Sequence, residues 1–361
     1  MLTPSRLTLA RKRRGMTLSR LEKVTGITTR SLSAYENGRQ QPSRQYVEVL
    51  AKALAVPIAF LTAAEVDEIP VDAISFRALS KMTASQREAA RSAARLAIMI
   101  NDWIEERFRL PTLDLPTLPG HNPESAAERV RARWGLGEAP IPNMIHVLEA
   151  RGVRVFSLAQ ECVEVDAFSF YWNGTPFIFL NTMKSGERGR FDAAHECAHL
   201  VLDSEHVIPH GPEAEQRANR FASAFLMPQS SVIAKRLHNA TVDRILTGKR
   251  TFNVSAMALN KRLYELSLIT DWGYRSNAKN LSRLGYRSTE VDGIPRESSQ
   301  LLTKVLTSLR VDGVTPADIA KDLNFSVGEL NKHVFGLVLT LLRGGSAPSP
   351  PAQPSLHLVE S

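Results

Sequence analysis

Residues 195–199 read His-Glu-Cys-Ala-His, and the interpretation of the whole chain starts from them. Two histidines four residues apart in a helix lie one turn above each other on the same face. Both imidazoles can therefore reach a single metal ion, and Glu196 lies beside them. Small or apolar residues surround the pair at helical spacing: Phe191, Ala194, Ala198, Val201 and Leu202. We predict a buried helix with a metal-binding face.

The spacing His-Glu-x-x-His is that of zinc peptidases, although the five residues alone also occur by chance. Zinc at such a site keeps one position open for water and lowers the pKa of that water to about 7. The carboxylate of Glu196 can then take the proton as the water attacks an amide. The metzincin form of the pattern is excluded, because Leu202 stands where that form needs glycine.

A third ligand is expected in the next helix, which we predict from Glu213 to Met227. Glu215 lies on the apolar stripe of this helix, with an asparagine one turn later. Glu213 instead shares a face with Arg217 and Arg220 and is expected to be solvated. The stripe itself consists of Ala218, Ala222, Phe225 and Leu226. We therefore predict Glu215 as the third ligand.

Three segments around this site together resemble the ImmA/IrrE family of metallopeptidases: "PFIFLN" (176–181), "RFDAAHECAHLVLD" (190–203) and "EQRANRFASAFLMP" (215–228). The resemblance covers roughly residues 145–230. It implies Zn²⁺ on His195, His199 and Glu215, with Glu196 as the general base. Family members often carry glycine before the second histidine, where this chain has the equally small Ala198.

The composition indicates a protein of two or three domains in a reducing compartment. The chain has 361 residues, of which 43% are hydrophobic, enough for real cores. Cys162 and Cys197 are too few for a disulfide framework, and the helical position of Cys197 points it away from the metal. The N-terminus has no apolar signal core, and no uncharged run reaches the ~18 to 20 residues of a membrane span. We expect a cytoplasmic protein.

The positive charge is concentrated in the first 64 residues. That segment holds eleven Lys or Arg and three Glu, a balance of +8, which equals the net charge of the whole chain. The remainder is neutral. Such clustering of basic residues is expected of a nucleic-acid-binding domain.

The pattern of apolar, capping and turn residues in 3–62 predicts five short helices. Thr17 can cap a helix that ends at the tight turn of Gly26, and a second helix follows from Thr28 to Asn37. A helix, a glycine turn and a second helix with exposed polar residues form the helix-turn-helix layout, whose second helix enters the major groove. The alternative is a helical bundle that binds only protein.

The segments "TLSRLEKVTGITTRSLSAYENGRQQPS" (17–43) and "LAKALAVP" (50–57) resemble the Cro/repressor-like (XRE) family. The resemblance implies binding of double-stranded DNA. Glu22 departs from the family, which usually places a small alanine there. Carried over by position, the residues facing bases are Thr28, Thr29, Arg30 and Ser33, and those near phosphates are Arg39 and Arg13.

The residue pattern in the rest of the chain predicts a small β-sheet that lies among helices. Helices are expected at 85–108, 126–134 and 145–149, and β-prone runs at 153–156, 167–171 and 177–180, with a hairpin at Asn173-Gly174. In zincins the edge of such a sheet holds an extended peptide. Asp166 and Asn181 lie near this edge, and we favour turn chemistry over a functional role for both.

The C-terminal third is predicted to be helical and then disordered. Residues 229–300 look mostly helical. Residues 315–335 again have helix-turn-helix spacing, with a turn at Asn324, but without a basic excess, which favours a packing or dimerisation element over a second DNA reader. The tail after Gly344 is rich in Pro and Ser and is expected to be disordered.

The predicted fold class is α+β and mostly helical. The expected parts are a helix-turn-helix domain (1–64), a linker and connector helix (65–110), a zincin-like domain (111–230), a helical region (231–343) and a disordered tail (344–361). The function expected is a DNA-binding regulator carrying a zinc endopeptidase that cuts a repressor or antitoxin in stress response or prophage control, with a homodimer as a candidate assembly. The rival is a transcriptional repressor whose zincin domain only binds metal or senses a signal.

Overall fold

The computed structural model describes residues 1–70, 73–74, 83–158, 165–203, 211–334 and 336–338. The chain divides into two compact units. Unit 1 consists of residues 1–110, 156–165 and 300–361, and unit 2 of residues 111–155 and 166–299. The helical region predicted at 231–343 is thus shared between the units, with the division after residue 299. The predicted disordered tail lies outside the described residues.

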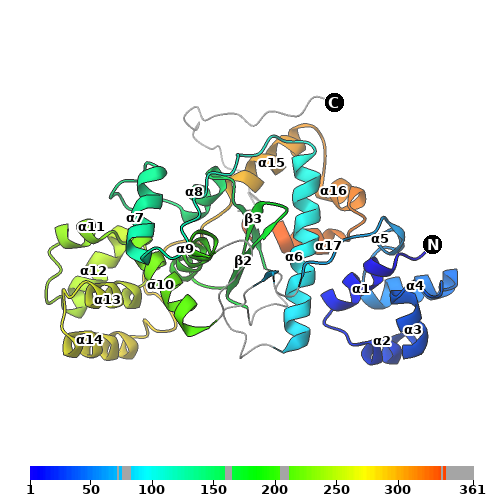
Figure 1. The fold of residues 1–361 in the computed structure, drawn as a ribbon, viewed down its shortest axis with the longest axis horizontal. Coiled ribbons are helices and arrows are strands. Elements are labelled where there is room, and N and C mark those ends of the chain that lie inside the picture. Colours follow the sequence, from blue (N-terminus) through cyan, green and yellow to red (C-terminus); the bar gives the residue numbers. More distant parts are fainter. Residues whose placement is uncertain (71–72, 75–82, 159–164, 204–210, 335, 339–361) are drawn as a thin grey trace. The chain divides into compact units, whose positions relative to one another are not determined.

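The N-terminal part of unit 1 contains the five predicted helices, shown in blue in Figure 1. They are α1 (Pro4–Arg13), α2 (Leu18–Thr25), α3 (Thr29–Glu36), α4 (Arg44–Leu54) and α5 (Ile58–Thr62). Thr17, Thr28 and Ser43 cap three of them, each accepting a hydrogen bond from a backbone N–H in the first turn. Gly26 (φ 72°) ends α2 in the left-handed conformation and makes the turn to α3. Leucines fill the core between these helices: Leu7, Leu21, Leu32, Leu50 and Leu61.

The second part of unit 1 contains α6 (Ala84–Glu105), α15 (Gln300–Val311), α16 (Pro316–Asp322) and α17 (Val327–Val334). The long helix α6 begins with a capping box between Thr83 and Gln86. It packs against α1 and against α17, and α16 packs against α17. Asn324 (φ 57°) makes the predicted turn between α16 and α17. The segment with a second helix-turn-helix spacing therefore packs on α6, as the packing interpretation predicted.

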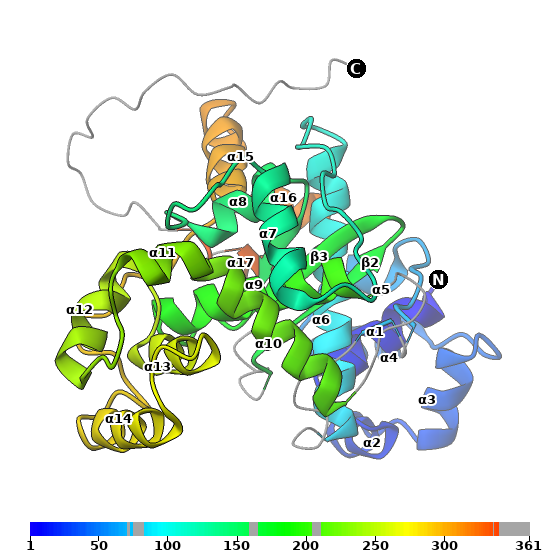
Figure 2. The same cartoon turned by 60° about the vertical axis from the view of Figure 1, so that its left-hand side comes forward.

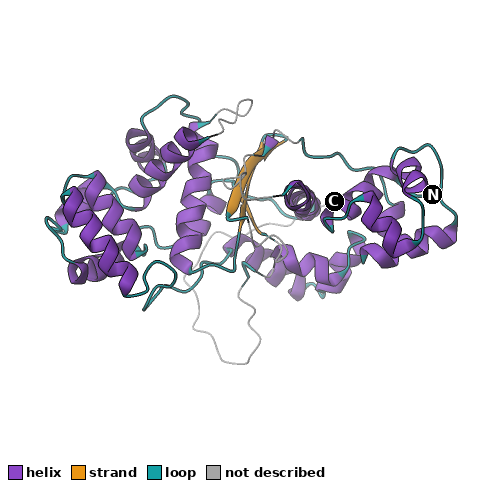
Figure 3. Cartoon of the chain, turned by 90° about the horizontal axis from the view of Figure 1, so that it is seen from below, coloured by secondary structure: helices purple, strands orange, loops and turns teal. Residues whose placement is uncertain are grey.

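Among the described residues, the sheet contains β1 (Arg154–Ser157), β2 (Ala167–Trp172) and β3 (Thr175–Leu180) in the order β1–β3–β2, so β2 lies at an edge of this described sheet. Figure 3 shows it in orange. β2 and β3 form the predicted hairpin, with Trp172 opposite Thr175. Asn173 (φ 49°) and Gly174 (φ 76°) both adopt the positive φ that a two-residue hairpin turn requires.

The two faces of the hairpin have different partners. Side chains alternate along a strand, so the paired residues Phe168–Phe179 and Phe170–Phe177 share one face, where their rings stack. Ser169 lies on the opposite face, the one that contacts α9. This alternation turns a hydroxyl of β2 toward the helix that carries the two histidines.

The helices of unit 2 surround the histidine helix, α9 (Gly186–Leu202). α10 (Pro212–Leu226) packs against α9 and against α7 (Pro123–Arg133), and α8 (Met144–Ala150) also packs on α9. Figure 2 shows α9 and α10 side by side, with the helical lobe beyond them. That lobe consists of α11 (Gln229–Ala234), α12 (Val242–Phe252), α13 (Ala256–Glu265) and α14 (Asp271–Arg283).

The fold class agrees with the prediction: the chain is α+β and mostly helical, with one small sheet in its described part. None of the helices among the described residues is both long and apolar enough to span a membrane. The bounds of the five parts given above remain predictions, since compactness alone does not define them.

Candidate metal and DNA-binding sites

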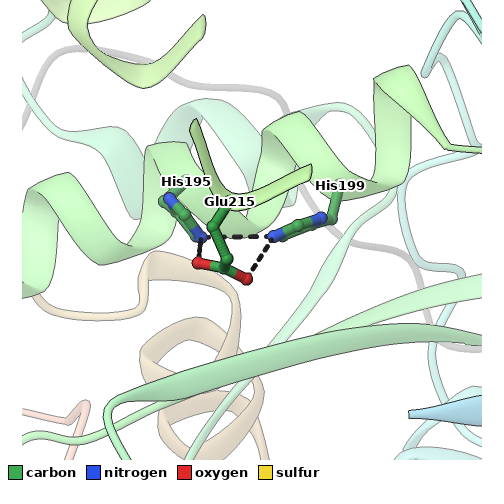
Figure 4. Close-up of side chains that lie close together, drawn as sticks. All are labelled: His195, His199 and Glu215. Atoms are coloured by element: carbon green, nitrogen blue, oxygen red, sulfur yellow. Dashed lines mark hydrogen bonds and ion pairs between the residues drawn. The ribbon is translucent and has the colours of Figure 1, made fainter. Parts of the chain in front are cut away.

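The two histidines lie on one face of α9, as their spacing predicts. Ser185 caps the helix by accepting a hydrogen bond from the N–H of Arg188, and thirteen of its residues are buried. His195 is fully buried and His199 nearly so. Their Nε2 atoms are 3.2 Å apart (Figure 4). The buried helix therefore presents two nitrogen ligands at a single point.

Glu215 of α10 completes the group. Its carboxylate oxygens lie 3.3 Å from Nε2 of His195 and 3.6 Å from Nε2 of His199. The ligand atoms of these three residues all lie within 4.8 Å of one another, and Figure 4 shows them pointing toward the same point. Glu213, at the start of α10, is exposed. Two imidazoles and one carboxylate form a donor set that fits a divalent cation and leaves a coordination position open.

The second ring nitrogen of each histidine, Nδ1, has its own hydrogen-bond acceptor. Nδ1 of His195 lies 3.2 Å from Oδ1 of Asn219, and Nδ1 of His199 lies 2.8 Å from Oδ2 of Asp203. Such partners fix the tautomer that leaves Nε2 free for a metal. The sequence pattern placed Asn219 on the same face of α10 as Glu215 but assigned it no role. Asp203 was not identified from the sequence. The signal for Asp203 was its spacing, four residues after His199, at the end of the helix.

The local charges favour a cation at this point. Burial opposes ionisation of Glu215, but both histidines outweigh it and lower the pKa of Glu215 to about 2. Burial likewise opposes protonation of His199, but hydrogen bonds to Asp203 and Glu215 outweigh it and raise the pKa of His199 to about 10. The imidazoles and the carboxylates thus stabilise each other's charged forms, and the carboxylates of Glu215, Glu196 and Asp203 surround the imidazole of His199 with negative charge. A divalent cation placed between the ligands meets the same negative charge.

Glu196 is buried beside the candidate metal ligands and is hydrogen-bonded to the sheet. Oγ of Ser169 donates to Oε2 of Glu196 over 2.8 Å and lies 3.2 Å from the backbone carbonyl of the same residue. Burial raises the pKa of Glu196, an effect that the nearby histidines and the Ser169 hydrogen bond partly offset. A carboxyl group with a raised pKa is suited to accepting and returning a proton. Sequence reasoning missed Ser169, because its contact depends on the strand alternation in β2.

The two polar residues near the sheet edge make local contacts. Oδ1 of Asn181 accepts a hydrogen bond from the N–H of Met183, a turn of the Asx type. Asp166 forms ion pairs with Lys184 and Arg188, both in the segment that leads into α9. The contact of Asn181 agrees with the preference for turn chemistry, whereas Asp166 forms ion pairs with residues 18 and 22 positions away.

The residues expected to face DNA lie around α3. Thr28 and Arg30 are exposed at its start, whereas Thr29, its first residue, and Ser33, one turn later, are half-buried. Arg39 is exposed just after the helix. These five positions belong to one helix and its following loop, as a major-groove reading helix requires.

Glu22 contacts α3 directly. The hydroxyl of Thr29 donates a hydrogen bond to the carboxylate of Glu22. Glu22 occupies the position where the resembling family usually has alanine, and in this chain it is held by the first residue of α3. The hydroxyl proton of Thr29 is therefore engaged within the protein.

Arg13 does not lie where a phosphate contact needs it. Its side chain is 2% exposed, and its Nε lies 2.6 Å from Oε1 of Glu329 in α17. Arg14 also pairs with Glu329, at 3.2 Å. A buried, paired guanidinium cannot reach a DNA backbone, so the expected role of Arg13 at phosphates is corrected. The phosphate role was carried over by position from the family resemblance, and the acidic partner of Arg13 lies 316 residues away in the sequence.

The comparisons with protein families agree with these two sites. Residues 148–264 match the model of the IrrE N-terminal-like peptidase domain, and residues 7–61 match the helix-turn-helix model. The comparison with curated proteins found no match. The peptidase family is a metallopeptidase family, which implies a bound metal, and the helix-turn-helix domain supports DNA binding. The chain therefore combines an XRE-type helix-turn-helix domain with an IrrE/ImmA-like metallopeptidase-family domain.

Proposed function

We propose that this protein is a DNA-binding regulator with a zinc-dependent endopeptidase activity. The observation that carries the proposal is the convergence of His195, His199 and Glu215 within 4.8 Å, beside the buried carboxylate of Glu196. A purely structural metal site has no need of a base, whereas hydrolysis does. Zinc is the divalent ion most often held by two histidines and a carboxylate with one position open.

Each residue of the site has one task in this proposal. Nε2 of His195, Nε2 of His199 and the carboxylate of Glu215 hold Zn²⁺, which when bound supplies Lewis-acid activation of water and of the peptide carbonyl. Glu196 accepts a proton from the attacking water and returns it to the leaving amine. Ser169 orients Glu196 through the 2.8 Å hydrogen bond.

The substrate backbone is proposed to bind along β2. This strand is at an edge of the sheet, and its Ser169 contacts Glu196, so a peptide that pairs with β2 passes beside the base. Extended peptides commonly bind by adding a strand to an exposed edge. An extended substrate implies that the cleaved segment of the target protein is unfolded or in a loop.

The proposed biological setting follows the family resemblance. The protein acts in the cytoplasm, where the helix-turn-helix domain brings the peptidase to a DNA-bound repressor or antitoxin, cleaved under stress or at prophage induction. Binding as a homodimer is part of this proposal. Metal analysis and a proteolysis assay, on the wild type and on Glu196→Gln, test the peptidase part.

The DNA-binding part predicts a specific effect of Arg30→Ala. We expect weaker binding to double-stranded DNA and a salt dependence reduced by about one unit in slope, because an exposed arginine at the start of α3 releases a counterion when it binds. Fluorescence anisotropy with a labelled duplex over a range of salt concentrations measures both. Arg283→Ala, an exposed arginine of α14, is the matched control. Unchanged affinity and slope in Arg30→Ala would count against the proposed DNA interface.

A further inference from the structure

A large cavity in unit 2 adjoins the proposed metal site. Its volume is about 1750 Å³, and Glu215 and Asn219 of α10 line it. Its other walls come from the segment leading into α9, from α13 and from residues 286–290. Small-molecule pockets usually measure about 300 to 1,000 Å³. The cavity is thus large enough for a stretch of polypeptide that begins at the metal ligands.

The acidic side chains that line the cavity all have partners. Glu215 belongs to the metal ligands, and Glu187 is buried and accepts a hydrogen bond from the N–H of Ile294 at 2.8 Å. The other four each contact a basic side chain. These pairs are Glu124 with Arg262, Asp166 with Lys184 and Arg188, Glu265 with Lys261, and Glu290 with Lys249.

The same pairs engage four of the six basic residues in the lining. Lys184, Arg188, Lys261 and Arg262 are all in ion pairs. Lys261 also lies over the rings of Tyr264 and Tyr274, at 5.2 and 5.5 Å. Because these four side chains are already in ion pairs, little of their positive charge is available to a ligand.

Arg220 and Arg287 are different. Both line the cavity and both are exposed. Within the described part of the chain, neither has an acidic side chain within ion-pair distance. Two charged groups that line a cavity without an ion-pair partner create a positive potential there, and the ligand that binds then supplies the counter-charge.

We propose that this cavity selects substrates with acidic residues close to the cleaved bond, through Arg220 and Arg287. The inference rests on the proposed peptidase function and adds the chemical class of its substrate. Arg220 follows Glu215 by five residues in α10, a distance of about 7.5 Å along the helix axis. An extended chain covers this distance in about two residues. Arg220 also lies about 140° around the helix from Glu215, but both residues line the same cavity, so we place the selected aspartate or glutamate about two to four residues from the cleaved bond, within reach of the long side chain of Arg220.

Binding of a defined peptide tests the proposal without relying on hydrolysis. The probe is a fluorescein-labelled short peptide of alternating alanine and glutamate, compared with its alanine–glutamine counterpart. Both are titrated against the zinc-loaded full chain carrying Glu196→Gln, so that neither is cut. We expect Arg220→Ala and Arg287→Ala each to weaken binding of the glutamate peptide about five- to tenfold and to leave the glutamine peptide nearly unchanged.

Two further variants separate the cavity from the general positive charge of the chain. Arg129→Ala removes an exposed arginine of α7 that does not line the cavity, and it is expected to have no effect. Arg220→Glu is expected to reverse the preference, so that an alanine–lysine peptide binds better than the glutamate peptide. Both arginines are exposed, so these variants are expected to fold.

The outcomes distinguish this inference from the proposed function. Equal affinity of the wild-type cavity for the two peptides overturns the inference, as does an equal loss in Arg220→Ala and Arg129→Ala. Either result leaves hydrolysis by the wild type untouched. Conversely, if the arginine-dependent preference is found but the wild type cuts no peptide of a proteome-derived library, the cavity assignment stands and the peptidase proposal fails.

Discussion

Substitution of Glu196 by glutamine is expected to lower the rate of peptide hydrolysis by about two to four orders of magnitude without loss of bound metal. Glutamine has nearly the same shape, and its side-chain oxygen can still accept the hydrogen bond of Ser169. It cannot accept a proton from water. The rate is measured with the zinc-loaded full chain on a proteome-derived peptide library, with cleavage sites read by mass spectrometry, and metal content is measured on the same samples.

The wild type treated with a chelator and the wild type resupplied with zinc are the controls. Cleavage by Glu196→Gln at the wild-type rate would contradict the assignment of Glu196 as the base. If the wild type holds metal at His195, His199 and Glu215 but cuts nothing, the rival function is favoured. The zincin domain would then be a metal-binding or sensing scaffold of a transcriptional regulator.

The second large effect is expected from Glu329→Ala, at about 3 to 5 kcal/mol of lost stability in unit 1. Glu329 is buried in α17 and is the acidic partner of both Arg13 and Arg14 of α1. Removing it leaves the guanidinium of Arg13, 2% exposed, without that compensating charge. Hydrogen–deuterium exchange of α1 and α17 measures the loss locally, which matters because the two units need not unfold together.

The exposed pair of Arg44 and Glu48 in α4 provides the matched control, with Glu48→Ala expected to change stability by less than about 0.5 kcal/mol. Glu329→Gln keeps the shape and one acceptor oxygen and is expected to lose less than Glu329→Ala. Unchanged exchange in α1 of Glu329→Ala would contradict the account of a buried ion pair that joins α1 to α17.

The pH dependence of this pair has a definite sign. Burial opposes ionisation of Glu329, but the nearby ring of His333 and the charges of Arg13 and Arg14 outweigh it and hold the pKa of Glu329 well below its usual range. A lowered pKa in the folded state stabilises the fold above the unfolded pKa of about 4.3, and this contribution is lost as the pH falls toward the folded value. The difference in stability between wild type and Glu329→Ala should therefore shrink only in acid.

Local patterns in the sequence predicted the elements and the clustering of the three candidate metal ligands. The spacing of His195 and His199 depends only on helix geometry, and the place of Glu215 depends only on which face of α10 is apolar. The Asn173-Gly174 turn likewise predicted the hairpin from two adjacent residues. Each of these predictions depends on contacts within one helix or between neighbouring strands. The local order of residues largely determines such contacts.

Contacts between distant segments could not be predicted in the same way. Ser169 and Glu196 are 27 residues apart, and their contact depends on how β2 is aligned against α9. Arg13 and Glu329 are 316 residues apart, so their ion pair could not be foreseen when Arg13 was assigned to DNA phosphates by its position in the helix-turn-helix segment. A charge balance over a segment reveals nothing about which of its charges are neutralised by the rest of the chain.

The central claim is that one divalent cation is bound by His195, His199 and Glu215, and anomalous diffraction at the zinc absorption edge tests it most directly. The account predicts a single strong peak in zinc-loaded crystals, about 2.0 to 2.2 Å from Nε2 of each histidine and from a carboxylate oxygen of Glu215. A peak bound by other residues, or no peak between these three side chains in a protein that contains one equivalent of zinc, would contradict it.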